Sequence, residues 1–166
     1  MKFKGEKVSA RNLEICVIPR GDGDSVVFKC QAVLDMDDFE KLCPVPKPPQ
    51  RMMAGGKKVI DIEDPIYKHK IEDRNDKRIS YLILKSLEAT EDLEWETVVM
   101  GDSDTWGNYE TEFKQAGFSP VEIMRIINSC MTANCLNEDK LKEARDSFLA
   151  SQQAQLEAQL SPNIEQ

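Results

Sequence analysis

The side chains best suited to chemistry in this sequence are carboxylates, and they gather between Glu88 and Glu112. Carboxylates such as Glu94, Glu96 and Asp102 can act as general acids or bases. The sequence shows no Ser-His or Cys-His arrangement, so nothing indicates an activated nucleophile or a tuned base. We therefore predict that the protein is not an enzyme. The acidic residues of the stretch, which holds no basic residue, are Glu88, Glu91, Asp92, Glu94, Glu96, Asp102, Asp104, Glu110 and Glu112.

Metal chemistry has weak support in the sequence. Cys130 and Cys135 are too few ligands for a zinc site, and the chain contains no C-x-x-C motif. The single histidine, His69, lies among charged residues, which is typical of a solvated helix face. We predict no metal and no cofactor, and we expect the cysteines to be reduced and buried as small hydrophobic residues. The five cysteines are Cys16, Cys30, Cys43, Cys130 and Cys135.

The composition indicates one soluble domain. The chain has 166 residues, of which 40% are hydrophobic and 31% charged. The net charge of −8 argues against a nucleic-acid partner, because phosphates are bound mainly by Lys and Arg. No apolar run approaches the roughly 18 residues that a membrane helix needs, and the first residues lack the apolar core of a signal peptide. We expect a cytosolic protein that binds neither nucleic acid nor membranes.

Both tryptophans, Trp95 and Trp106, lie within the acidic stretch. Trp106, Tyr109 and Phe113 recur at helical spacing and form one aromatic face. Such a face is usually core, since tryptophan is well buried on average. It could instead form a surface for a protein partner, so these three residues and Trp95 remain candidates for partner binding.

The other candidate partner-binding segment is a proline-rich, basic loop over residues 43–60. Four prolines between Pro44 and Pro49 argue against regular structure, and two glycines follow them. The loop carries only basic charge, opposite to that of the acidic stretch. It could cross back over the acidic surface, or it could be a mobile arm that grips another subunit or a client. The candidate contact residues on it are Pro48, Arg51, Met52 and Met53.

The elements that must position these segments can be predicted from local patterns. Two β-branched runs, 13–18 and 25–32, flank a turn-rich segment and predict a hairpin. Helices are predicted over 35–42, with Phe39 and Leu42 on one face, and over about 64–88, opened by Asp64 and Pro65. Further helices are predicted over about 105–116, capped within 102–104 and ended by Gly117, and over 119–133, opened by a capping box. The last helix follows Asn137. The expected apolar faces are Ile71, Ile79, Leu82, Ile83 and Leu87 on the second helix; Ile123, Ile126, Ile127, Cys130 and Met131 on the fourth; and Leu141, Ala144, Phe148 and Leu149 on the last.

Together these elements predict a mainly helical α+β domain of four to five helices. An N-terminal β-hairpin or small sheet (12–33) precedes the long proline-rich basic loop (43–60) and the helical part (64–150). Residues 1–11 are expected to form a flexible N-terminal lead, and residues 12–150 a single domain. Residues 151–166 form a glutamine-rich tail that could fold on a partner.

Four stretches carry a resemblance to a known family. They are LEATEDLEWETV, TWGNYETEFKQAGFS, EIMRIINSCMTANCLNEDKLKEARDSFL and VFKCQAVLDMDDFEKLCPVPKPP. Over about residues 12–150 the chain resembles the tail assembly chaperones of long-tailed (siphovirus-type) bacteriophages. The resemblance rests on Trp, Gly-Phe-Ser and Ala-Asn-Cys-Leu positions and not on a catalytic signature.

The resemblance implies a non-enzymatic chaperone that coats the tape-measure protein in the host cytoplasm while the tail tube polymerises, and that is absent from the finished virion. It also implies contact with the tail tube protein and a longer frameshifted form of the chain, which would extend beyond Ala150. An alternative from another class is a structural virion protein, a tail or connector subunit. Such a subunit would form homo-oligomers through the hairpin and the proline-rich arm.

Overall fold

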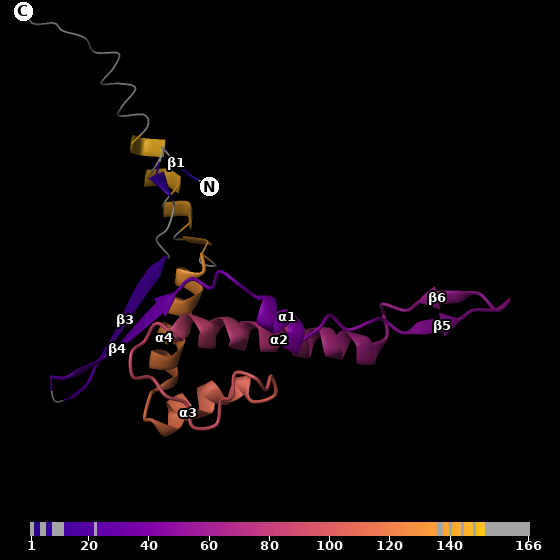
Figure 1. Ribbon diagram of the computed structural model, residues 1–166, viewed down its shortest axis with the longest axis horizontal. Helices are drawn as coiled ribbons and strands as arrows, with labels where there is room; N and C mark the ends of the chain where they lie inside the picture. The colour runs from indigo at the N-terminus through magenta and orange to yellow at the C-terminus, as the bar shows by residue number, and fades with distance from the viewer. Residues whose placement is uncertain are drawn as a thin grey trace, which may run out of the picture.

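The computed structural model of the protein describes residues 2–3, 6–7, 12–21, 23–135, 138–139, 141–143, 145–147 and 149–151. It confirms the α+β class, with an N-terminal hairpin followed by helices (Figure 1). Each described sheet is an antiparallel strand pair. Residues predicted as a flexible lead contain one of these pairs, β1 (Lys2–Phe3) with β2 (Glu6–Lys7).

The central hairpin joins β3 (Leu13–Pro19) to β4 (Ser25–Gln31), as the sequence predicts. At its turn the Arg20 amide donates to the Asp24 carbonyl at 2.8 Å, and Gly23 has a φ of +83°. The side chains alternate, so that one face of the hairpin is buried and the other is exposed. The buried face consists of Cys16, Ile18, Phe28 and Cys30.

Helix α4 (Pro120–Ala133) packs across this hairpin, in contact with both strands. Its predicted capping box is confirmed: the Ser119 amide donates to Glu122 Oε2 at 2.7 Å, and the Glu122 amide donates to Ser119 Oγ at 3.3 Å. Arg20 Nη1 lies 3.0 Å from Glu122 Oε1, which ties the hairpin turn to the start of the helix. Ile123, Ile126, Cys130 and Ala133 are its buried residues, while Ile127 and Met131 are half-buried.

Helix α2 (Pro65–Leu87) begins as predicted, with Asp64 Oδ1 accepting from the Tyr67 amide at 2.8 Å and Pro65 in the first turn. Only its C-terminal end is buried. The predicted apolar face was partly wrong, since Ile79 is 47% exposed. The face that meets the core differs from the predicted one and includes Tyr81, whose ring centroid lies 5.0 Å from that of Trp106. Its buried residues are therefore Tyr81, Ile83, Leu84, Ser86 and Leu87.

The short helices differ in detail from their predictions. Helix α1 (Asp37–Leu42) buries Phe39 but leaves Leu42 41% exposed, because Cys43 takes the next position facing the core. The helix predicted over 105–116 is divided into a 3₁₀ turn, η1 (Trp106–Asn108), and α3 (Tyr109–Gln115). No side chain caps either piece, so the predicted caps at 102–104 were wrong. Gly117, with a φ of +86°, ends α3 as predicted.

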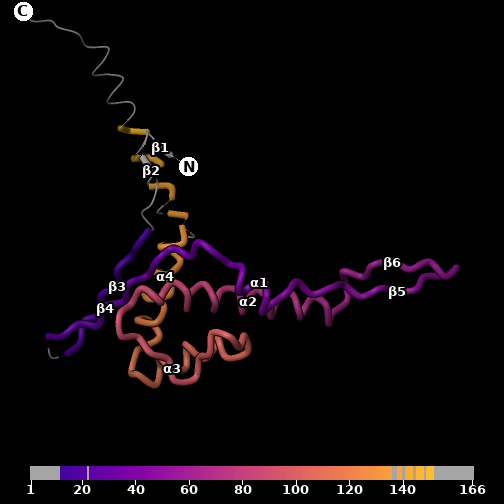
Figure 2. The backbone as a smooth tube through the Cα atoms, viewed as in Figure 1, coloured from indigo at the N-terminus to yellow at the C-terminus, as the bar shows by residue number. Residues whose placement is uncertain are grey.

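The proline-rich segment forms a hairpin, contrary to the prediction of no regular structure. Strands β5 (Gln50–Met52) and β6 (Lys58–Ile60) pair on either side of a turn in which the Met53 amide donates to the Lys57 carbonyl at 2.9 Å. All four prolines precede β5, so none removes a donor from the paired strands. The hairpin projects beyond the start of α2 and away from the acidic stretch (Figures 1 and 2), so the predicted crossing of the acidic surface is wrong. We call residues 44–61 the arm.

The described residues between 138 and 151 are helical and continue away from the central hairpin beyond α4 (Figure 2). Leu141 is 42% exposed and Leu149 is 52% exposed, so the predicted buried face is wrong at these two positions. They are exposed because this segment leaves the core behind. Asn137, Ala144 and Phe148 lie outside the described residues, as does the glutamine-rich tail from residue 152 onward.

Candidate functional site

The predicted aromatic face proves to be the core of the molecule. Trp106 is fully buried, with its ring centroid 6.1 Å from that of Phe39, and its Nε1 donates to the Met100 carbonyl at 3.2 Å. Tyr109 and Phe113 are also buried, at 4% and 3% exposure. Their burial argues against Trp106 and Tyr109 as partner-binding residues, whereas Phe113 also lines the groove described next.

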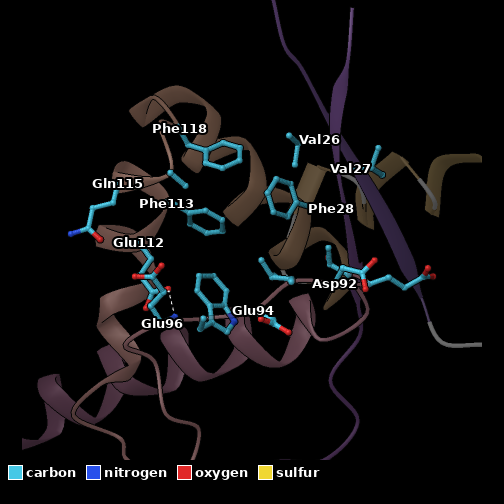
Figure 3. Close-up of a pocket in the computed structure, with 15 residues that line it drawn as sticks. Val26, Val27, Phe28, Asp92, Glu94, Glu96, Glu112, Phe113, Gln115 and Phe118 are labelled. Atoms are coloured by element: carbon cyan, nitrogen blue, oxygen red, sulfur yellow. Dashed lines mark hydrogen bonds between the residues drawn. The ribbon is translucent and has the colours of Figure 1, made fainter. Parts of the chain in front are cut away.

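Trp95 lies differently, at the edge of the core and only half-buried. It lines a groove of about 420 Å³ formed between β4, the segment 90–96 and the end of α3. Phe28, Phe113 and Phe118 turn toward one another inside this groove (Figure 3). Each pair of these phenylalanines has ring centroids 5.5–5.7 Å apart in edge-to-face contact. The Trp95 ring stands edge-on to Phe113 at 5.3 Å.

Acidic side chains surround these rings. Glu96 and Glu112 lie on one side of the groove and Asp92 on the other (Figure 3). Lys29 Nζ lies 2.6 Å from Glu91 Oε1, so that carboxylate is paired. Asp92, Glu94 and Glu96 form no ion pair within the described residues. The groove therefore has an aromatic floor and a negative rim, and we call it the aromatic groove.

Glu112 stabilises one wall of the groove through its carboxylate. Its carboxylate accepts from the amides of Glu96, Thr97 and Val98 at 2.8, 2.7 and 3.1 Å, and from the Thr97 hydroxyl at 2.6 Å. Burial by itself would raise the pKa of Glu112, but these hydrogen bonds outweigh it and lower the pKa. The charged carboxylate thus holds the segment 96–98 against α3.

The opposite wall is held by Thr90, which extends the hydrogen bonding of β4. Its hydroxyl accepts from the Lys29 amide at 2.9 Å and donates to the Lys29 carbonyl at 3.0 Å. The next residues turn sharply, and Asp92 has a φ of +60°, a conformation that Asp tolerates better than most residues. The groove is thus assembled from three separate parts of the chain.

The arm presents a second surface of opposite character. Every residue from 51 to 60 is exposed, including Met52 at 66% and Ile60 at 60%. Between residues 44 and 60 the charged residues are Lys47, Arg51, Lys57 and Lys58, all of them basic. Arg51 has one distant ion-pair contact, 3.7 Å from Asp61. The arm brings together the predicted contact residues Arg51, Met52 and Met53, whereas Trp95 belongs to the aromatic groove.

The base of the arm is fixed by Arg74 of α2. Its Nε donates to the Cys43 carbonyl at 2.8 Å, its Nη2 pairs with Glu40, and its guanidinium lies 4.9 Å above the Phe39 ring. Pro48 follows this anchor and is half-buried. An extended chain gains about 3.3 Å per residue, so the arm can reach up to roughly 35 Å from Cys43.

A third apolar surface is the outer face of the central hairpin. Leu13, Ile15, Val17 and Val27 point away from the core and are 44–56% exposed. Successive side chains of a strand point to opposite faces, so residues 13, 15 and 17 face outward because Cys16 and Ile18 face inward.

Most of the cysteines are packed in the core. Cys16, Cys30, Cys43 and Cys130 are buried as predicted, whereas Cys135 is exposed, against prediction. The Sγ atoms of Cys30 and Cys130 lie 3.4 Å apart, and this contact, together with burial, raises the pKa of Cys30. A thiol held in this way is a poor nucleophile. Among the residues that the structure describes, no group of three or more His, Cys, Asp or Glu is placed to hold a metal ion.

Within the described chain, no helix is both long enough and apolar enough to cross a membrane. The chain matches no protein-family model, and no curated protein or solved structure matches it. Sequence reasoning identified Trp95 but missed Phe28 and Phe118 as groove residues. Phe118 lies in the Gly-Phe-Ser segment, beside the glycine that ends α3, and this position was the available signal.

Proposed function

We propose that the protein is a non-enzymatic tail assembly chaperone of a long-tailed bacteriophage, which binds the tape-measure protein and keeps it soluble during tail tube polymerisation. The observation that carries this proposal is the arm, a basic and apolar hairpin held out from the body with every residue from 51 to 60 exposed. Exposed apolar side chains on one projecting element are typical of binding surfaces. The sequence resemblance supplies the identity of the client.

The chemistry of the arm suits such a client. Methionine adapts to irregular apolar surfaces, so Met52 and Met53 can pack against the apolar stripe of a long helix. The basic residues attract acidic side chains that flank such a stripe. The whole chain has a net charge of −8, which helps to keep the complex soluble.

The test is co-expression of the chain with the tape-measure protein of the same phage. We expect a soluble complex, and we expect the arm variant Met52→Asp/Met53→Asp to lose it while remaining folded. The control variant Ile66→Asp changes an exposed residue of α2 outside the arm and should bind like the wild type. A wild-type chain that fails to bind or solubilise the tape-measure protein would refute the proposal.

A structural virion subunit is the second candidate. The exposed outer face of β3 and β4 favours it, because neighbouring subunits could cover that face. Mass spectrometry of purified virions separates the two functions. A chaperone is absent from finished particles, whereas a tail or connector subunit is present in fixed stoichiometry.

A further inference from the structure

We propose that the aromatic groove is the docking site for the arm of a second copy of this chain. This inference goes beyond the proposed function because it concerns the chain alone, although it uses the same arm. It gives the protein one donor surface and one acceptor surface, on different parts of the molecule.

The first support is complementary charge. The rim of the groove carries Asp92, Glu94 and Glu96, which form no ion pair within the described residues. The arm carries four basic residues and one acidic residue, Asp61, at its end. Such opposite fields steer two surfaces together and disfavour contact between two grooves or two arms.

The second support is complementary shape and side-chain chemistry. A groove of about 420 Å³ falls within the range of about 300–1,000 Å³ that is typical of binding pockets. The half-buried Trp95 and Phe118 rings offer apolar surface, and methionine makes favourable contacts with aromatic edges. The exposed Met52 and Met53 at the tip of the arm supply side chains of this kind, and Arg51 supplies a cation for an aromatic face.

The third support is geometry, which makes the contact intermolecular. Figure 1 shows the arm projecting from the start of α2, whereas β4 and α3, which line the groove, lie toward the other end of that helix. The arm of one molecule therefore points away from its own groove. Because donor and acceptor differ, the interface is heterologous, and repetition of it builds a ring or an open chain of subunits.

The test compares the full-length chain with two variants by sedimentation velocity over micromolar to millimolar concentrations. The arm variant is Met52→Asp/Met53→Asp, and the groove variant is Glu94→Lys/Glu96→Lys. We expect wild-type protein to form larger species as its concentration rises, and we expect added salt to weaken this self-association. Each variant should weaken self-association about tenfold or more, since the arm variant removes the apolar contacts and the groove variant reverses the charge of the rim.

Mixing the two variants gives the decisive result. The groove variant keeps an intact arm and the arm variant keeps an intact groove, so an equimolar mixture should form heterodimers and nothing longer. The control variant Glu72→Lys/Asp76→Lys makes the same charge change on exposed residues of α2 and should associate like the wild type. A monomeric wild type, a variant that still associates fully, or a mixture that stays monomeric would overturn the inference.

The outcome is independent of the proposed function. The groove variant retains the arm, so it should still bind the tape-measure protein while failing to self-associate. If the wild type self-associates as expected but never binds that client, the chaperone proposal fails and this inference stands.

Discussion

The aromatic groove and the arm contain similar kinds of residue, apolar and charged, but the chain supports them in different ways. The groove depends on contacts between distant segments, such as Thr90 with Lys29 and Glu112 with residues 96–98. The arm is held by hydrogen bonds between near neighbours, such as Met53 to Lys57, and is joined to the body at Arg74. The difference teaches that the groove forms only when the core folds, whereas residues of the arm can be substituted without disturbing the core.

The largest contrast is expected from Trp106→Ala in the body. Removal of this fully buried ring leaves a cavity beside Tyr81 and Phe39, so the free energy of unfolding should fall by about 3–5 kcal/mol. Urea denaturation measures this loss. The arm variant Met52→Ala serves as the comparison, and we expect its change to stay within about 0.5 kcal/mol. Equal losses in the two variants would show that the arm is part of the core.

A smaller effect is expected from Glu112→Ala in the groove wall. The substitution leaves the amides of residues 96–98 without their acceptor, which should cost about 1–2 kcal/mol because the site is partly open to water. Glu110→Ala, two residues earlier, removes a 3.9 Å contact with Lys114 and a 3.3 Å hydrogen bond from the Tyr109 hydroxyl, and it should cost less than Glu112→Ala because no backbone amide loses its acceptor. Thermal unfolding of both variants tests this difference.

Glu112 also predicts a pH dependence of the groove. Its folded-state pKa is lowered from an ordinary value of 4.5, so its contribution to stability is complete above that pH and is lost as the pH falls through the folded pKa. The stability advantage of wild type over Glu112→Gln should therefore shrink on acidification below about pH 4.5. An advantage that stays constant down to pH 3 would contradict this account.

The junction between body and arm is tested by Arg74→Ala. The change removes a hydrogen bond to Cys43, an ion pair and a contact with the Phe39 ring, for an expected loss of about 1–2 kcal/mol. Hydrogen exchange should accelerate at the Cys43 amide, which donates to the Phe39 carbonyl at 2.7 Å. Arg74→Lys keeps the charge without the planar fork, so it should fall between wild type and alanine.

The smallest global effect is expected from Gly55→Ala/Gly56→Ala at the tip of the arm. These glycines have φ values of +94° and +77°, so each alanine should introduce roughly 1 kcal/mol of local strain. Because the turn is bonded only to itself, the melting temperature should not change. Faster hydrogen exchange at the Met53 amide would report the weakened turn, and a lowered melting temperature would show coupling to the body.

Local signals predicted much of the fold correctly. The Ser119–Glu122 capping box, the Asp64–Pro65 helix start and the stop at Gly117 follow from the bonding needs of helix ends, which neighbouring residues satisfy. The central hairpin also followed from its β-branched runs and the turn residues between them. The helix predicted over 105–116 failed in part, because Trp106 enters the core through a 3₁₀ turn that local spacing does not reveal.

The candidate sites divide along the same line. The sequence by itself determined the basic charge of the arm, the acidity of the stretch from Glu88 to Glu112 and the presence of the aromatic rings, because these are properties of residues. Only the tertiary structure decided that Trp106 is buried while Trp95 lines a groove with Phe28 and Phe118. It also decided that the arm projects as a hairpin (Figure 1). The physical reason is that burial depends on which distant segments pack together, and no local pattern records that choice.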